Sequence, residues 1–349
     1  MGAALLLQRS KAFRWFWAKV PYFVVVKTVA EIEELYQAAL KPKLEAFEER
    51  RFTLYHQRRQ LVGLTVAVIT FAGLVTLGYG LPYWWALLAG LPVVALSAYL
   101  YRQKFVDPNM GTAIQEMLAQ ELLPKLFKDP QHDPEKSIPY KYFSESMFFT
   151  HLPENFGGRH LLKGQDGDLP FLLSEISASY DSGDPPTKGQ TIILLDGLLF
   201  VTLFRRDFAA PVVVLSDDTR QQLGRLGRKI QQANLYRPHY TQLFEDEFAD
   251  HFAIYTNDVV EIRQILTPQT RQQLLQLKKD SGLAIHFSLI GNRITIALNG
   301  PLINFDPSAR CDNPAYVMQY YEKVTFLLSF GRAINELLAP KKTELSWDL

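Results

Sequence analysis

The feature that most constrains this chain is an uncharged stretch from Leu61 to Tyr101, where 41 consecutive residues include no Asp, Glu, Lys, Arg or His. One membrane-spanning helix needs about 20 apolar residues, so this stretch is long enough for two. The sequence LGYGLPYWW interrupts it near the middle, because Gly80 and Pro82 disfavour a helix and the neighbouring aromatic residues suit a membrane interface. We therefore predict a two-helix transmembrane hairpin with spans at 60–78 and 83–101.

A buried helical hairpin of a soluble protein is the alternative interpretation. Soluble helices of this length almost always carry a polar stripe, and this stretch has none. Neither predicted span holds an ionisable residue of the kind that marks ion or proton pathways in membrane proteins. The hairpin therefore indicates an anchor or an assembly surface more than a transport path.

Basic residues flank the hairpin on both sides, and its connecting turn is uncharged. Under the positive-inside rule this pattern predicts a membrane protein with two spans and with both termini in the cytoplasm. The flanking residues are Arg50, Arg51, Arg58 and Arg59 before the first span and Arg102 and Lys104 after the second.

Charge and cysteine content exclude several classes of protein. Residues 1–60 hold 11 Lys and Arg against 6 Asp and Glu, whereas residues 102–349 hold 26 against 30. A slightly acidic surface argues against nucleic-acid binding, which requires clustered basic residues. Cys311 is the sole cysteine of the sequence, so an intrachain disulfide and a Cys-rich zinc site are excluded. A reducing compartment fits this count.

Four segments follow from these patterns. They are an N-terminal membrane-proximal helical segment at 1–59, the transmembrane hairpin at 60–101, a cytoplasmic α+β domain at 102–340 and a polar tail at 341–349. Within the first, KAFRWFWAKVPYF alternates aromatic and basic residues and either lies on an anionic membrane surface or packs on the domain. A helix beginning near TVAE leads into the first span, with a kink expected at Pro42.

The long cytoplasmic segment has the pattern of a mostly antiparallel sheet with helices packed on it. We expect a helix at 111–127, a loop at 129–139, a strand at 211–215 and a helix starting at Pro268. Strand hairpins are predicted around Asp196-Gly197 and Gly291-Asn292, because both pairs favour tight turns between apolar runs. A closing helix is expected at about 314–338.

Four sequence blocks resemble a bacterial family of unassigned activity, the domain of unknown function 3137. They are HLLKGQDGDLPFLLSEI, LLDGLLFVTLFRRDF, FEDEFADHFAIYTNDVVEIRQILTP and IHFSLIGNRITIAL. The third block is the nearest to the family pattern, at Phe244, Phe248, Phe252, Tyr255, Asp258, Glu261, Arg263, Thr267 and Pro268, together with Glu245 and Leu266. In the first block the matching residues are Gly164, Gly167, Asp168, Ser174 and Glu175. The resemblance implies a membrane-anchored cytoplasmic domain and gene neighbours encoding LemA-type membrane proteins, and it supplies no catalytic residue.

The third block also holds the densest group of candidate chemical residues. On a helix, Glu247 and His251 share a face and Asp250 adds a third group, which suggests a weak divalent-metal or acid/base site. The competing interpretation uses the helical spacing of Phe244, Phe248 and Phe252, which would bury aromatic rings and leave the acids exposed to solvent. We favour the second interpretation and expect Asn257 or Asp258 to cap a following helix.

A second candidate is the basic segment around Gly224 and Gly227, where Arg225, Arg228 and Lys229 could contact an anion or the membrane surface. It lacks the Gly-Lys-Ser/Thr ending of a phosphate-binding P-loop, and a solvated basic segment is the simpler interpretation. The other histidines show no metal-ligand spacing, and His286 is expected to face solvent. We predict no metal site and no cofactor.

By the resemblance to a bacterial family, we expect a multi-pass protein of the bacterial inner membrane. The preferred hypothesis is a membrane-anchored binding, scaffold or regulatory module that acts through a membrane protein partner, of LemA type by the resemblance. A homo-oligomer is compatible with it. A subunit of a membrane transport or envelope assembly is the first alternative. A membrane-surface hydrolase that uses Glu247, Asp250 and His251 with a metal is the second.

Overall fold

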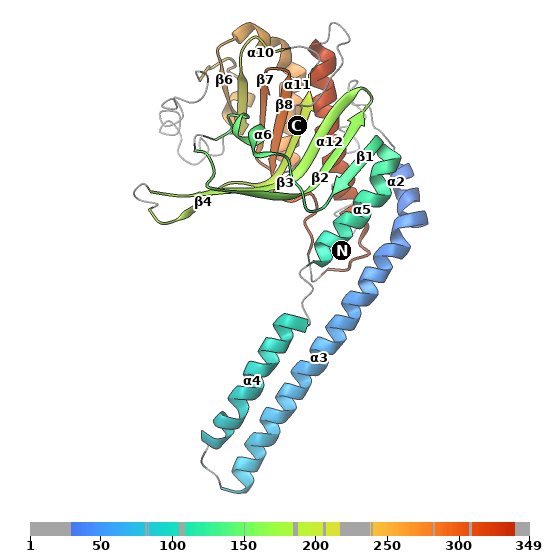
Figure 1. Ribbon diagram of the computed structural model, residues 1–349, viewed down its shortest axis with the longest axis vertical. Helices are drawn as coiled ribbons and strands as arrows, with labels where there is room; N and C mark the ends of the chain where they lie inside the picture. Colours follow the sequence, from blue (N-terminus) through green and yellow to red (C-terminus); the bar gives the residue numbers. More distant parts are fainter. Residues whose placement is uncertain are drawn as a thin grey trace. The chain divides into compact units, whose positions relative to one another are not determined.

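The computed structural model describes residues 29–338, except 81, 83, 105–108, 150, 184–187, 205–206, 217–237, 239, 282 and 307–308 (Figure 1). The predictions for residues 1–28, for Arg225, Arg228 and Lys229, and for the tail at 341–349 lie outside these residues. The described chain forms two compact units. One contains 119–304 and 315–338, and the other contains 30–118 and 305–314.

The first unit is built on an eight-stranded sheet in the order β1-β2-β3-β4-β8-β7-β5-β6, in which every pair of neighbours is antiparallel. The strands are β1 Lys128–Asp133, β2 Asn155–Asp166, β3 Leu169–Asp181, β4 Thr191–Leu203, β5 Val212–Ser216, β6 Phe252–Thr256, β7 Ile285–Ile290 and β8 Arg293–Asn299. The helices are the end of α5 Met110–Leu126, α6 Tyr140–Ser144, α9 Phe248–His251, α10 Val259–Ile265, α11 Pro268–Ser281 and α12 Pro314–Leu338. This confirms a mixed α+β fold with an antiparallel sheet.

The two faces of the sheet are covered by different kinds of structure. On one face α12 lies close to β4 and β7, where Phe287 and Phe330 meet edge to face at 5.3 Å between ring centroids. Gly331 makes this approach possible, because a Cβ there would lie 3.0 Å from the Thr202 methyl group. The helix spans Pro314–Leu338, as predicted from its apolar pattern.

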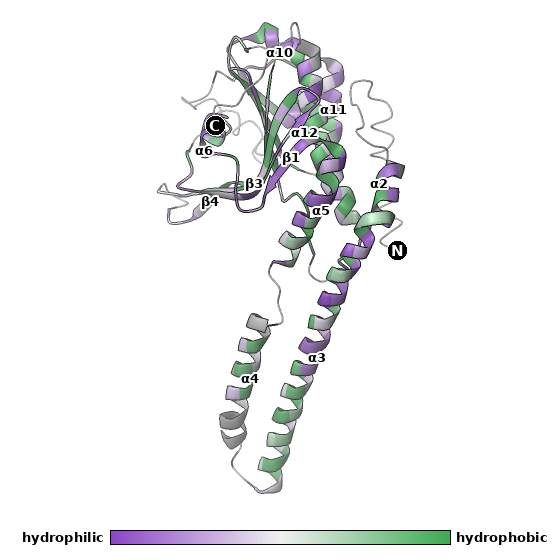
Figure 2. Ribbon diagram, turned by 45° about the vertical axis from the view of Figure 1, so that its right-hand side comes forward, coloured by the Kyte–Doolittle hydropathy of each residue, from purple (hydrophilic) through white to green (hydrophobic). Residues whose placement is uncertain are grey.

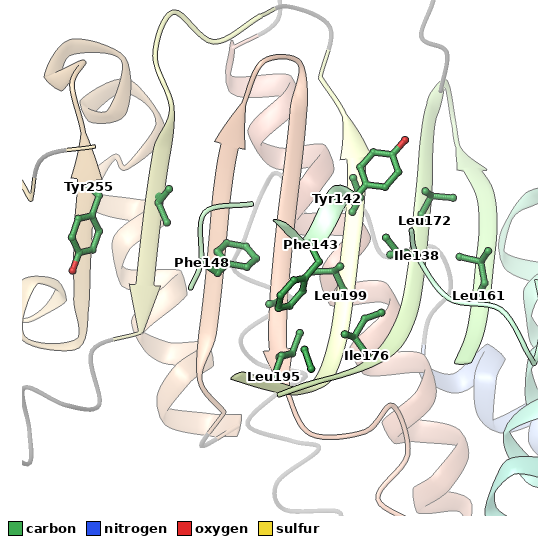
Figure 3. Packing of buried hydrophobic residues seen from close by; sticks show 14 of the residues in the cluster. Ile138, Tyr142, Phe143, Phe148, Leu161, Leu172, Ile176, Leu195, Leu199 and Tyr255 are labelled. Carbon is green, nitrogen blue, oxygen red and sulfur yellow. The ribbon is translucent and has the colours of Figure 1, made fainter. Parts of the chain in front are cut away.

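On the other face an irregular segment that contains α6 covers the sheet. Figure 3 shows four side chains of this segment packed over residues of β2, β3 and β4. The covering side chains are Ile138, Tyr142, Phe143 and Phe148, and the strand residues beneath them include Leu161, Leu172, Ile176, Leu195 and Leu199. All nine are nearly inaccessible to solvent, so this segment completes the core on a face that no long helix of the described residues covers.

Two expectations about the sheet are wrong. The predicted loop at 129–139 begins with strand β1, which pairs with β2 even though it contains Pro130. The predicted turn at Asp196-Gly197 lies inside the continuous strand β4. Glycine is required at 197 for a different reason, since a Cβ there would lie 2.1 Å from the Leu298 carbonyl oxygen of β8.

The second unit contains a long helix and a shorter antiparallel partner. Helix α2 (Val29–Leu35), the π-helical turn η1 (Tyr36–Leu40) and α3 (Lys41–Gly78) run on continuously, and α4 spans Trp84–Lys104. The π-helical turn lies where a kink was expected at Pro42. Because proline has no N–H, the preceding turn widens and the Lys41 N–H bonds to the Tyr36 carbonyl five residues back.

The apolar part of α3 is the region that the membrane prediction concerns, and Figure 2 shows it as a run of hydrophobic residues. Within the described residues, the helix Glu31–Gly78 is long and apolar enough to cross a membrane, and its most apolar window is not buried. The second helix has a shorter apolar stretch, Gly90–Leu100. Membrane spans and signal sequences share this length and composition. The described structure therefore contains one candidate span, and the pair of spans stays a prediction.

Replacement of Gly197 by alanine tests the close approach of β4 and β8. We expect Gly197→Ala to lower the free energy of unfolding by roughly 1–3 kcal/mol, because the new methyl group collides with backbone that cannot rotate away. Gly157→Ala is the matched control, since this glycine lies in β2 with ordinary backbone angles and a Cβ there would meet no atom within 4 Å. Chemical unfolding followed by circular dichroism measures both variants. Equal stability of the two would contradict this explanation.

Candidate functional site

The acidic segment before β6 is held against α11 by ion pairs. Asp246 accepts a hydrogen bond from Arg271 Nε at 2.8 Å, and Glu247 Oε1 lies 2.5 Å from Lys279 Nζ. The His251 Nε2 atom is 3.9 Å from the same Glu247 oxygen. Lys279 lowers the pKa of Glu247 by direct hydrogen bonding. The carboxylate of Glu247 therefore forms an ion pair with Lys279 on the exposed surface.

The aromatic residues of this segment lie on its inner side. Phe248 and Phe252 are buried, with stacked rings at 4.6 Å between centroids, and Phe244 meets Phe248 edge to face. The Arg271 guanidinium sits 3.9 Å from the Phe244 ring centroid. The helix here is a single turn, so Phe252 already belongs to β6. The segment is an aromatic anchor with an acidic outer face.

Other family-like residues of the block also have structural roles. The Asp258 side chain caps α10 by accepting from the backbone N–H groups of Val260 at 2.9 Å and Glu261 at 3.1 Å. Glu261 is buried and accepts from the Ala209 N–H. Thr267 accepts from the Thr270 N–H at the start of α11, where Pro268 is the first residue. Tyr255 is buried in β6, whereas Arg263 is exposed on α10.

These contacts give little support to chemistry at Glu247, Asp250 and His251. Among the residues that the structure describes, no group of three or more His, Cys, Asp or Glu side chains could hold a metal ion. Cys311 is buried beside Met110, and burial raises the pKa of its thiol to about 11, so it is an unreactive thiol at neutral pH. His286 was expected to face solvent, and this expectation is wrong, because the residue is half-buried. Its Nδ1 atom accepts from the Ser216 N–H at 3.2 Å, and its ring lies near Phe148.

Two histidines join β1 to β2. Their spacing along the sequence does not predict this contact. His132 Nε2 and His160 Nδ1 are 3.3 Å apart, and the rings are parallel within 7° with centroids 5.5 Å apart. That centroid distance nearly equals the nitrogen separation plus both ring radii, so the rings lie end to end. One ring therefore donates an N–H to the other, and which one does so depends on the tautomer.

His160 is the buried member of this pair. It is 2% exposed, has the left-handed backbone angle φ +58° at an irregularity in β2, and its Nε2 atom has no hydrogen-bond partner within the described structure. The backbone N–H of His160 donates to the Pro134 carbonyl at 3.0 Å. The pair therefore fixes the segment after β1 to the middle of β2.

Glu175 on β3 is the carboxylate whose charge acts on His160. It accepts from Arg159 Nε at 2.9 Å and from the Leu302 N–H at 3.0 Å, so both carboxylate oxygens have partners. The adjacent Ser174 accepts from the Ile138 N–H at the start of the covering segment. The Ser174 and Glu175 pair of the first family-like block thus ties three separate parts of the chain to β3.

Burial dominates the ionisation of the histidine pair. It lowers the pKa of His160 to about 4, with Glu175 opposing the shift and the positive charges of His132 and Arg159 adding to it. Burial also lowers the pKa of His132, against the attraction of Asp133. Both rings are therefore neutral at neutral pH, and the pair is a structural tie.

The sequence contained no local signal for this pair. His132 and His160 are 28 positions apart, and they meet only because β1 pairs with β2. The segment with His132 was predicted as a loop, since Pro, Asp and Lys are uncommon in strands. Only the assignment of residues 128–133 to a strand that pairs with β2 would predict the contact.

Residues 193–336 match the family model described as "Protein of unknown function (DUF3137)". This part of the chain is a DUF3137 domain. The match begins within β4, so the helical pair of the second unit and the block with Ser174 and Glu175 lie outside it. No curated protein matches the chain. The crystal structure of the mycobacterial trehalose monomycolate transport factor A, TtfA, is similar to 68% of this chain and all of that chain, at 9% identity and a TM-score of 0.35.

The histidine pair makes stability depend on pH. The pKa of His160 is about 4 in the folded protein and 6.5 in the unfolded chain. Its neutral form therefore contributes fully to stability above pH 6.5, and this contribution is lost as the pH drops towards 4, because the unfolded chain binds the proton first. We expect a loss of at most about 3 kcal/mol over that range. In His160→Asn this part of the pH dependence should disappear, and asparagine tolerates the left-handed backbone.

Urea unfolding at half-unit pH steps measures the effect. His151→Asn is the control, since His151 is exposed and stacks on Tyr180 away from the pair. It should keep the wild-type profile. An unchanged pH slope in His160→Asn would show that other groups cause the acid sensitivity.

Proposed function

We propose that this chain is a membrane-anchored module in which α3 and α4 span the bilayer and the DUF3137 domain binds a protein partner on the cytoplasmic side. The observation that carries the proposal is the apolar surface of α3, much of which stays exposed beside α4. Its exposed side chains are Val62, Leu64, Val66, Val68, Ile69, Phe71, Leu74 and Leu77. A surface of this size in water would be unfavourable, and a lipid phase covers it on all sides.

The dimensions of the helices support the proposal. The uncharged part of α3, from Leu61 to Gly78, is about 27 Å long, close to the thickness of roughly 30 Å of a bilayer core. Thr65 and Ser97 hydroxyls are 2.7 Å apart and set the alignment of α3 against α4. At this alignment Arg59 and Arg102 lie at the same height, at the end away from the uncharged turn. Both charged ends would then lie on the cytoplasmic side.

The domain supports binding more than catalysis. The acids around Glu247 are engaged by basic side chains of α11, and the buried residues around Glu175 hold strands and loops together. A LemA-type membrane protein is the partner that the family resemblance suggests. We propose no substrate and no cofactor.

Lysines placed in the apolar surface test the anchor. Each one should oppose insertion by about 2.5–3.5 kcal/mol at the helix centre. We therefore expect Val66→Lys combined with Phe71→Lys to be extracted by alkaline carbonate, while the wild type stays in the membrane pellet. Val260→Lys is the control, because Val260 is 70% exposed on α10 and should tolerate charge without any change in membrane association.

The same tagged proteins test the binding half of the proposal. After gentle solubilisation, mass spectrometry of the wild type should identify a second membrane protein at near-stoichiometric amounts, lost in the double lysine variant. Extraction of the wild type by carbonate would contradict the anchor. A wild type that stays in the membrane and purifies without another protein would contradict the partner.

A further inference from the structure

The part of α3 that precedes its apolar stretch is strongly basic. From Arg50 to Val106 the chain contains six Lys and Arg residues and no Asp or Glu. Two of the six, Arg58 and Arg59, are exposed and come directly before the uncharged part that begins near Leu61. Figure 2 shows the change from hydrophobic to hydrophilic residues along this helix.

The chain itself neutralises one arginine of this group but leaves another without a nearby acid. Arg51 donates to Glu48 through Nε at 2.8 Å and through Nη2 at 2.6 Å. For Arg59 the nearest acid of α3 is Glu49, which is ten residues or about 15 Å away along the helix, and α4 contains no acid. Arg59 also lies in the interior of α3, where there is no helix end for its charge to stabilise.

The basic end of α4 lies at the level of these arginines. The contact between the Thr65 and Ser97 hydroxyls at 2.7 Å aligns the two helices. Arg58 and Lys104, the last residue of α4, are each seven residues from that contact and so share one height. Seven residues are almost two full turns, so Arg58 is on the same face of α3 as Thr65, towards α4. Like charges on neighbouring helices repel, and an anion at this level would offset the repulsion.

This level corresponds to the headgroup layer if the apolar part of α3 fills the bilayer core. A bilayer is about 30 Å thick in its core and about 40–45 Å with its headgroups, so each headgroup layer is crossed by roughly four or five helical residues. With Leu61 at the border of the core, these are residues 56–60. Long side chains of a helix lean towards its N-terminus, which for Arg58 and Arg59 is the direction away from the core.

An aromatic residue marks the outer border of this layer. Tyr55 is 53% exposed, and its ring meets the ring of the exposed His56 edge to face at 6.4 Å between centroids. Exposed tyrosines are enriched where a membrane meets water, because the ring is apolar and the hydroxyl is polar. Residues 55–59 of α3 thus combine an interfacial aromatic residue with two arginines.

We propose that Arg58 and Arg59, together with the basic end of α4, bind the phosphate group of an anionic phospholipid. This inference rests on the proposed function, because the hairpin meets a headgroup layer only when it is embedded in a bilayer. Charge complementarity selects the lipid, since a guanidinium donates two parallel hydrogen bonds to phosphate oxygens and the stretch holds no competing carboxylate. A zwitterionic headgroup carries its own ammonium group and gains less.

Lipid retention by the full-length protein tests the proposal. The protein is reconstituted in bilayers of equal parts phosphatidylglycerol and phosphatidylethanolamine and extracted gently, and native mass spectrometry counts the lipids that stay bound. We expect the wild type to retain the anionic lipid in preference. Arg58→Gln combined with Arg59→Gln should lower this preference roughly tenfold.

Lys125→Gln combined with Lys188→Gln is the matched control. It removes the same charge at two exposed positions outside α3 and α4, so it should keep the wild-type preference. The arginine variant should stay in the membrane pellet after alkaline carbonate, because the apolar parts of both helices are unchanged. This separates loss of the lipid from loss of the anchor.

The outcomes distinguish this inference from the proposed function. An embedded wild type that retains both lipids in the ratio of the bilayer would overturn the lipid site and leave the anchor intact. An equal loss of preference in the lysine control would also overturn the site, because the overall charge of the protein would then explain the preference. Extraction of the wild type by carbonate would instead overturn the proposed function.

Discussion

The close approach of β4 to β8 at Gly197 is the constraint on which the sheet depends. With no side chain at this position, the Leu298 backbone passes where a Cβ would stand, and β4 continues as one strand of 13 residues. That continuity joins the β1–β3 half of the sheet to the half that contains β5–β8. It also carries β4 past the end of β8, so among the described strands residues 191–195 pair with β3 alone.

Local signals in the sequence predicted a good part of this fold. The β7–β8 hairpin turns at Gly291, where φ is +58°, and Asp258 caps α10, because in both cases neighbouring residues determine the structure. The same kind of signal failed at Asp196-Gly197. A glycine after aspartate can serve a turn or a close backbone contact, and only the position of β8 decides between them.

Contacts between distant residues explain the remaining differences. Strand β1 has a composition unfavourable for strands, so its pairing with β2 and the histidine pair that follows from it could not be predicted. In the acidic segment the predicted burial of aromatic rings is confirmed for Phe248 and Phe252, although Phe252 belongs to a strand and not to the same helix. The partners of its carboxylates Asp246 and Glu247 are Arg271 and Lys279, which lie 20 or more residues later in the chain on α11 and so could not be inferred from local spacing.

The proposed function requires that the turn between α3 and α4 and the sheet domain lie on opposite sides of a membrane. Labelling with a membrane-impermeant maleimide tests this directly, with one cysteine at Tyr79 in the turn and one at Lys188 in the domain. Cys311 does not interfere, because it is buried and the pKa of its thiol is raised to about 11. We expect Tyr79→Cys to be labelled in intact spheroplasts and Lys188→Cys to be labelled only after permeabilisation. Labelling of both, or of Lys188→Cys alone, in intact spheroplasts would contradict the proposed membrane topology.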